Sequence, residues 1–143
     1  MKLENRLRAA EHAMGVLQKH IAALGPVVVR EKQVFAGATL LNGEKTITDA
    51  VYEQTLFNTT IFHGNVRIAT RAIALGETER ALGTRANDDI TRLVFEQGEI
   101  FRGRTETLGK PWVIVYVPFH AANGQRIGML SSYRELVAAA ARP

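Results

Sequence analysis

The sequence predicts an α+β fold in which helices flank a five-stranded antiparallel sheet and a long helix precedes it. Apolar residues recur at helical spacing through the first 24 residues. Two-residue turns, Gly64-Asn65 and Asn123-Gly124, each separate two runs of β-favouring residues, which is typical of antiparallel hairpins. Strands therefore follow strands directly, and this grouping distinguishes the chain from α/β folds.

The composition is that of one globular domain. The chain has 143 residues, 46% of them hydrophobic, which suffices for a single core. Its net charge of +4 comes from arginines scattered along the chain and not from a basic run, so a nucleic-acid partner is permitted but not indicated. The same balance suits a site for small anions.

The sequence also limits the kinds of site and location. The absence of cysteine excludes disulfides, thiolate zinc sites and c-type haem attachment. No stretch reaches the roughly 18 apolar residues of a membrane span, and the charged N-terminus is not a signal peptide. We expect a cytoplasmic protein if this chain is the whole of it, or a periplasmic or extracytoplasmic domain if it is cut from a membrane receptor.

The first segment is expected to be a helix that ends at Gly25-Pro26. Its apolar positions alternate in steps of four and three, the heptad period: Leu3, Leu7, Ala10, Met14, Leu17, Ile21 and Leu24. A narrow seam of this kind suits a partner helix, so we expect residues 1–25 to form a homodimer contact and residues 26–143 to form the globular domain. The alternative is that the seam packs on its own domain.

The segment 27–42 is expected to be a short strand or an irregular connector. A second helix is expected over 48–56, with Thr46 or Thr48 as its cap. Its inward-facing residues are expected to be Ile47, Val51 and Leu56. The runs TTIFH and VRIAT then form the first hairpin around Gly64-Asn65.

After a glycine-containing loop, a helix is expected to begin at Asn87, where a cap residue followed by two acids favours a helix N-terminus, and to end at Gly98. Three strands are expected to follow, over 99–108, 111–119 and 125–130. The tail, SYRELVAAAAR, is expected to be helical from its propensity.

Four stretches together resemble one family. TTIFHGNVRIATRA resembles its two strands around a tight turn, and ALGT resembles the Gly-Thr that follows. GEIFRGRTETLGKPWVIVYVPFHAANGQRIGML resembles its closing block, and GATLLNGEKTITDAV its lead-in. In this order and spacing, over about residues 34–130, they resemble the single Cache domain, the PAS-like small-ligand sensor module of bacterial chemoreceptors and sensor kinases. Members usually have Asn where this chain has Arg71.

The resemblance implies a PAS-like fold in which ligand lies between the sheet and the helix and loops that cross it. It implies a sensor in bacterial signal transduction, for example in chemotaxis, with a small organic anion such as a short carboxylate as ligand. Carboxylate sensors of this kind have a basic and a small polar residue at the spacing of Arg67 and Thr70. Side chains alternate along a strand, so this pair reaches one ligand only if the strand twists, bulges or ends near Thr70.

Two further arginines are candidate ligand-binding residues. Arg102 and Arg104 are two residues apart and share a face of their strand. Because a guanidinium presents a planar fork that fits a carboxylate, the two together suit a clamp for a small organic acid. The alternative is that both point to solvent while Phe101 and Gly103 point inward.

The strand that follows offers an aromatic face. Trp112, Ile114 and Tyr116 share one side, and Val113, Val115 and Val117 share the other. The valines suit core packing, whereas Trp112 and Tyr116 are candidates for the wall of a pocket, with the Tyr116 hydroxyl as a ligand contact. Thr59 or Thr60, and Ser131 on the last strand, are candidates for further hydroxyls.

The sequence does not indicate catalysis, a metal or a cofactor. It contains no GxSxG, P-loop or Cys–His pair, and His63 and His120 lie singly beside turns without metal-ligand spacing. We therefore expect a sensor and not an enzyme. One alternative is a ligand-free PAS-like dimerisation module. A more distant one is a nucleic-acid binder that stacks bases on exposed aromatic rings, namely Phe62, Phe101 and Trp112.

Overall fold

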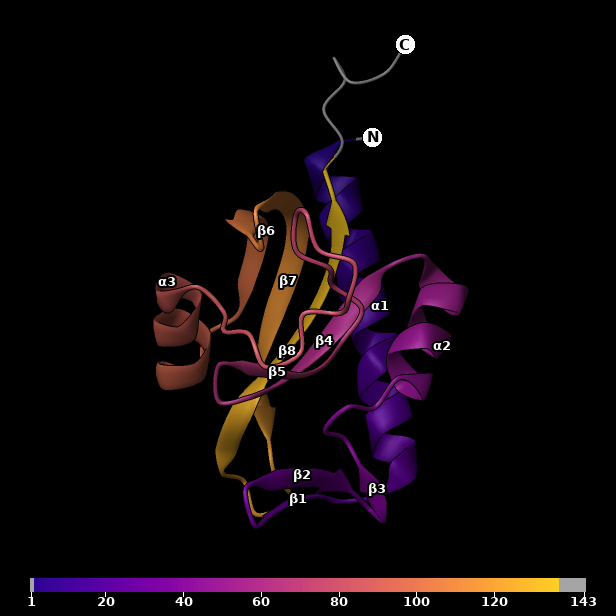
Figure 1. Cartoon of the computed structure of the whole chain (residues 1–143), viewed down its shortest axis with the longest axis vertical. Helices are drawn as coiled ribbons and strands as arrows, with labels where there is room; N and C mark the ends of the chain where they lie inside the picture. Colours follow the sequence, from indigo (N-terminus) through magenta and orange to yellow (C-terminus); the bar gives the residue numbers. More distant parts are fainter. Residues whose placement is uncertain (1, 137–143) are drawn as a thin grey trace.

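The computed structural model describes residues 2–136 and confirms the α+β class (Figure 1). The elements in chain order are α1 (Leu3–Leu24), β1 (Val27–Arg30), β2 (Gln33–Ala36), β3 (Thr39–Leu40), α2 (Thr46–Thr55), β4 (Asn58–His63), β5 (Val66–Thr70), α3 (Asp88–Ile90) continued by the π-helical turn η1 (Thr91–Glu96), β6 (Phe101–Thr107), β7 (Lys110–His120) and β8 (Arg126–Glu135). Helices α1 and α2 lie on one side of the main sheet, and α3 lies on the other (Figure 1).

The main sheet has the strand order β5-β4-β8-β7-β6, and every neighbouring pair is antiparallel. Alternation along β7 divides the core in two, as the sequence predicted. Val113 and Val115 pack in the cluster that includes α1, which we call the first core, on the first face of the sheet. Trp112, Ile114 and Tyr116 lie on the opposite, second face, in a cluster with residues of α3 and η1. The second face, which the loop 71–87 also crosses, carries the candidate site.

Helix α1 lies against the first face of the sheet (Figure 1). The central residues of its heptad seam are buried there, namely Leu7, Ala10, Met14, Leu17 and Ile21, together with the neighbouring Ala13. Leu3 and Leu24, at the ends of the seam, are exposed. The Ser132 hydroxyl of β8 also donates a hydrogen bond to the Ala10 carbonyl. The chain's own sheet therefore covers the centre of this seam, and the homodimer contact of residues 1–25 stays a prediction. The alternative, packing on its own domain, describes that centre.

The segment 27–42 is more regular than expected. It forms a separate antiparallel sheet in the order β1-β2-β3. The turn between the first two strands consists of Glu31 and Lys32, which have positive φ values of 49° and 67°. Hairpin turns of this kind usually contain Gly or Asn, so this turn lacks the residues by which the hairpin would have been recognised.

Helix α2 begins two residues earlier than expected, and its N-terminus is held differently. The Ile47 backbone N–H donates to the Glu44 carboxylate, 2.5 Å away, and neither predicted threonine caps the helix with its side chain. Leu56, which was expected to face inward, is 56% exposed because it ends the helix with a left-handed φ of 61°. Phe57 follows it and is buried in the first core.

Two further expectations are corrected near the second face. The Asn87 side chain does not cap α3 but donates to the Glu106 carbonyl of β6, 2.7 Å away. Residues Ser132–Glu135, expected to be helical, belong to β8, because pairing with β4 and β7 outweighs helix propensity. Residues 137–142 of the same expected helix lie outside the described residues.

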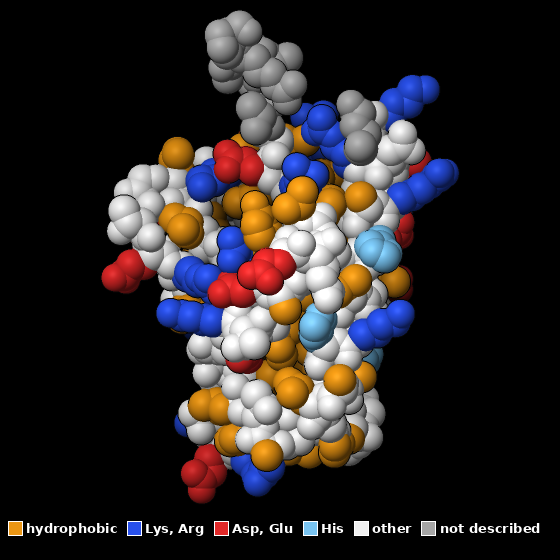
Figure 2. All heavy atoms as spheres, turned by 90° about the vertical axis from the view of Figure 1, so that its right-hand side faces the viewer, with side chains coloured by type: hydrophobic (Ala, Val, Ile, Leu, Met, Phe, Trp, Pro, Cys, Tyr) orange, Lys and Arg blue, Asp and Glu red, His pale blue; other side chains and the backbone are white. Residues whose placement is uncertain are grey.

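The charged side chains on the side of α1 and α2 are mixed. Figure 2 shows Lys and Arg spread over this face and interspersed with Asp and Glu, in agreement with the scattered arginines of the sequence. Within residues 2–136, no helix combines the length and the apolar character needed to cross a membrane.

Candidate functional site

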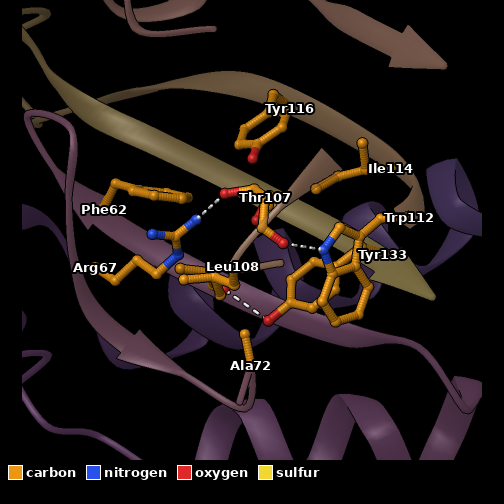
Figure 3. A pocket seen from close by; sticks show the side chains of 11 residues that line it. Phe62, Arg67, Ala72, Thr107, Leu108, Trp112, Ile114, Tyr116 and Tyr133 are labelled. Carbon is orange, nitrogen blue, oxygen red and sulfur yellow. Dashed lines mark hydrogen bonds between the residues drawn. The ribbon is translucent and has the colours of Figure 1, made fainter. Parts of the chain in front are cut away.

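A small cavity lies between the second face of the sheet and the segments that cross it (Figure 3). Its volume is about 10 Å³, which is room for about one water molecule. The lining residues come from five strands, from the loop 71–87 and from the turn between β6 and β7: Thr60, Phe62, Arg67, Ala72, Thr107, Leu108, Trp112, Ile114, Tyr116, Ser131 and Tyr133. Five candidate residues from the sequence therefore lie around one cavity, namely Thr60, Arg67, Trp112, Tyr116 and Ser131.

One row of hydroxyl-bearing side chains crosses the sheet on this face. The register pairs Thr70 with Thr60, Thr60 with Ser131, and Ser131 with Tyr116. Directly opposed residues share a face and have Cβ atoms about 5 Å apart. The row therefore brings together polar groups from four strands.

A β-bulge in β5 brings Arg67 onto the same face as Thr70. Thr70 pairs with Thr60, and Arg67 pairs with Phe62, but the register shifts by one residue between these pairs. The extra residue, Ile68, packs in the first core. Regular alternation would have placed Arg67 and Thr70 on opposite faces. The sequence predicted that Arg67 and Thr70 can reach one ligand only if the strand twists, bulges or ends near Thr70. The strand does bulge.

Arg67 is a buried cation, with 3% of its surface exposed. Its Nη1 donates to the Thr84 hydroxyl (3.0 Å) and the Arg85 carbonyl (2.8 Å), and its Nη2 donates to the Thr107 hydroxyl (3.3 Å). The guanidinium carbon lies 5.3 Å from the centre of the Phe62 ring. No carboxylate among the described residues lies within salt-bridge distance of it. Burial lowers the pKa of Arg67 because the charge is desolvated.

Three buried hydroxyls on this face form a closed network. Thr60 Oγ1 lies 2.7 Å from Thr70 Oγ1 and 2.8 Å from the Tyr133 hydroxyl, and the last two lie 3.2 Å apart. Thr70 Oγ1 also accepts a hydrogen bond from the Ala72 backbone N–H at 3.0 Å. Burial raises the pKa of Tyr133, so its hydroxyl stays protonated. The network fastens the start of the loop 71–87 to the sheet.

Tyr116 and Trp112 supply the aromatic wall. The Tyr116 hydroxyl points into the cavity (Figure 3). Burial raises the pKa of Tyr116 to about 12, although the nearby Arg67 charge acts in the opposite direction. The Trp112 Nε1–H donates to the Thr107 carbonyl, 3.0 Å away, and the indole meets the Tyr133 ring edge-on with centres 5.0 Å apart. Near neutral pH, Tyr116 is therefore a neutral hydrogen-bond donor beside a buried cation.

The structure does not bring Arg102 and Arg104 to this cavity. The register pairs Arg102 with Val115 and Arg104 with Val113, and both valines belong to the face that packs against α1. Arg102 forms ion pairs with two glutamates of α1, at 2.9 and 3.1 Å. The expected clamp is therefore corrected. Strand alternation turns both arginines to the opposite face, as the alternative assignment held.

Sequence reasoning missed several residues of the site. Tyr133 lies in the segment assigned to a helix; had the strand been extended that far, alternation would have placed Tyr133 beside Ser131 on one face. Thr84 lies in a loop and Thr107 lies at the end of β6. At such positions no periodic pattern indicates which way a side chain points. No residue signal in the sequence points to either of them as a partner of Arg67.

Asp49 of α2 holds the loop that crosses the cavity. Its Oδ1 accepts hydrogen bonds from Arg71 (2.7 Å) and Arg80 (2.8 Å), which lie at the two ends of the segment 71–80. Arg71 also donates to Asn58 and stacks on the Tyr52 ring. Arg71, which stands where the pattern described above usually has Asn, therefore has a structural role, because it attaches the loop to α2.

We expect Asp49→Asn to weaken this attachment. Burial opposes ionisation, but hydrogen bonds from Arg71 and Arg80 outweigh it and hold the pKa of Asp49 below its usual range. A lowered pKa stabilises the fold above the unfolded-state value, and the gain is lost as pH falls through the folded-state value. The loss near neutral pH should be about 1 kcal/mol or less, because the carboxylate is partly exposed.

Thermal melts of wild type and Asp49→Asn across the acidic range test this expectation. The difference in Tm should shrink as the pH falls below the ordinary range of aspartate. Asp89→Asn is the matched control, since Asp89 pairs with Arg92 but its side chain is 95% exposed. A difference that is the same at every pH would contradict the assignment to the Asp49 charge.

Comparison with known proteins adds two findings. The family model described as "Single cache domain 3" matches residues 39–132. The crystal structure of the E. coli DcuS sensor domain is similar, with a TM-score of 0.52 and 17% identity over 93% of this chain and 88% of that chain. No curated protein matches the sequence. Residues 2–136 contain no group of three or more His, Cys, Asp or Glu side chains placed to hold a metal ion.

Proposed function

Because this chain belongs to the single Cache domain 3 family, we propose that it is an extracellular-type sensor domain of bacterial signal transduction that binds a small organic anion, such as a short carboxylate. The family and the PAS-like fold shared with the DcuS sensor domain are the ones that the sequence resemblance implied. The observation that carries the anion proposal is the buried charge of Arg67.

A buried cation without an ion-pair partner is unfavourable unless something compensates for its lost hydration. Arg67 has only neutral acceptors among the described residues, the Thr84 and Thr107 hydroxyls and the Arg85 carbonyl. A guanidinium has five N–H donors, and three are used in these bonds, which leaves two. A carboxylate accepts such a pair of donors and supplies the missing negative charge.

The rest of the cavity suits a short acid. Tyr116 and Ser131 are neighbours across β7 and β8 and place two more hydroxyls on the Arg67 face. Trp112, Ile114 and Leu108 form an apolar wall that suits a short carbon chain. We propose that the carboxylate binds Arg67 and Tyr116, with Thr60 and Thr70 holding the surrounding strands in register.

A thermal-shift screen of acetate, propionate, lactate and pyruvate tests the proposal. A ligand that binds only the folded state stabilises it, by about 2.7 kcal/mol at a concentration 100 times its Kd. Acetamide and propionamide are the matched controls, because they keep the shape and remove the charge. We expect a rise in Tm with at least one acid and none with its amide. No shift with any acid at millimolar concentration would count against anion sensing.

The small volume of the cavity favours a second candidate, a PAS-like interaction module without a ligand. Phe62, Trp112 and Tyr116 leave room for about one water molecule. In that case a homodimer is the simplest assembly, and it would use the exposed side of α1, because the centre of the heptad seam is buried. A concentration-dependent dimer by analytical ultracentrifugation, together with an absent acid response, would favour this candidate.

A further inference from the structure

The cavity is too small for a ligand in this structure. About 10 Å³ is less than any organic carboxylate needs, so one wall must move before a ligand enters. The need for this movement rests on the proposed function, because it assumes that a ligand binds in this cavity. The wall that moves should be the one held by the fewest interactions, because local opening draws on the least stable parts of a fold.

The sheet is the fixed wall. Thr60, Ser131 and Tyr116 lie on β4, β8 and β7, each of which is hydrogen-bonded to strands on both sides. The remaining walls are Arg67 on the edge strand β5, which makes three hydrogen bonds, Ala72 in the loop 71–87, and Thr107 and Leu108, where β6 turns into β7. These walls lie at or beyond the edge of the sheet.

One backbone hydrogen bond joins the loop to the turn. The Leu75 backbone N–H donates to the Leu108 carbonyl, 2.8 Å away, and Gly109 packs directly against the Leu75 side chain. Leu75 is 69% exposed, so little other packing holds it. Leu108 and Gly109 both have positive φ, 56° and 75°. Leucine is strained in that region, where glycine is not.

We propose that Leu75 and the Leu108–Gly109 turn form the entrance of the ligand site, and that parting of this contact admits the ligand. The two segments meet through a single backbone hydrogen bond, an exposed leucine and a strained turn. Leu108 also lines the cavity directly. When this contact parts, Leu108 leaves the cavity wall while the strands that carry Arg67, Tyr116 and Ser131 stay paired.

Trp112 reports this opening without any ligand. It is the only tryptophan of the chain, lines the cavity and is 4% exposed. Its fluorescence should therefore be quenched by acrylamide chiefly when the entrance opens. Gly109→Ala places a methyl group 2.9 Å from the Leu75 Cβ, so it should part the contact and raise quenching several-fold.

Gly124→Ala is the matched control. Gly124 also has a positive φ, 88°, in a hairpin turn, but no atom lies within 4 Å of the added methyl group. Both variants therefore carry similar backbone strain, and only one disturbs the entrance. Equal quenching in both, with the fold intact by circular dichroism, would overturn the proposal.

A disulfide cross-link tests the same contact by holding it together, whereas Gly109→Ala parts it. The chain has no cysteine, and a Cβ on Gly109 would lie 2.9 Å from the Leu75 Cβ, so Leu75→Cys with Gly109→Cys creates one possible disulfide across the contact. The oxidised form should lose acrylamide quenching and bind acetate and pyruvate more slowly than the reduced form of the same protein. An oxidised form that is quenched as readily as the reduced one would overturn the entrance. If no acid binds but the quenching differences hold, the entrance stands and only the ligand proposal fails.

Discussion

Replacing Arg67 with methionine should give a chain that folds about as well as wild type but no longer responds to organic acids. The free energy of unfolding without ligand should stay within about 1 kcal/mol of wild type, because removing a costly buried charge offsets the loss of three hydrogen bonds. Removing a buried charged partner typically weakens binding by about 2–5 kcal/mol, which is at least about 30-fold. The acid-dependent rise in Tm should therefore disappear at millimolar concentration.

Arg102→Met is the matched control for this experiment. It makes the same chemical change on the opposite face of the sheet, where Arg102 is paired with Glu4 and Glu11. It should keep the acid response of wild type. Titration by calorimetry or thermal shift gives the comparison. An Arg67→Met chain that still responds to the same acid would place the anion elsewhere, and a chain that loses most of its stability would mean that Arg67 is mainly structural.

The parts of the fold that the sequence predicted are those set by short-range patterns. Gly64-Asn65 marks the β4–β5 hairpin through local turn geometry. Alternation from Trp112 to Tyr116 separates the two core faces within one strand. The prediction for the end of β8 was wrong because the partners of that strand, β4 and β7, lie far away in sequence. Propensity within Ser132–Glu135 contains no information about those partners.

The site residues on regular strands were predictable from the sequence, whereas those placed by a bulge, a loop or a turn were not. Thr60, Trp112 and Tyr116 lie on regular strands, so alternation and register bring them to one face. Arg67 reaches that face only through a bulge, and a bulge leaves no clear sign in a single sequence. The contacts of Arg67 with Thr84 and Thr107 depend on how a loop and a turn fold over the sheet.

Leu17→Ala should strongly destabilise the whole domain. Leu17 is fully buried in the cluster that joins α1 to the sheet. Truncating a leucine in such a position removes buried surface and leaves a cavity, at a cost of about 3 kcal/mol. For a chain of this size the Tm should fall by roughly 10 °C. The heptad pattern alone predicts a different result, loss of a partner with the sheet still folded, so the experiment separates the two roles of α1.

Leu3→Ala is the matched control, since Leu3 begins the same helix and the same seam but is 40% exposed. Its Tm should stay close to that of wild type, because little apolar surface is lost. Melts followed both by far-ultraviolet circular dichroism and by Trp112 fluorescence should coincide for Leu17→Ala, since α1 and the sheet share one core. If α1 melts first while the Trp112 signal is unchanged, then α1 is a separate unit, and the division at residue 25 that the heptad pattern predicted would hold.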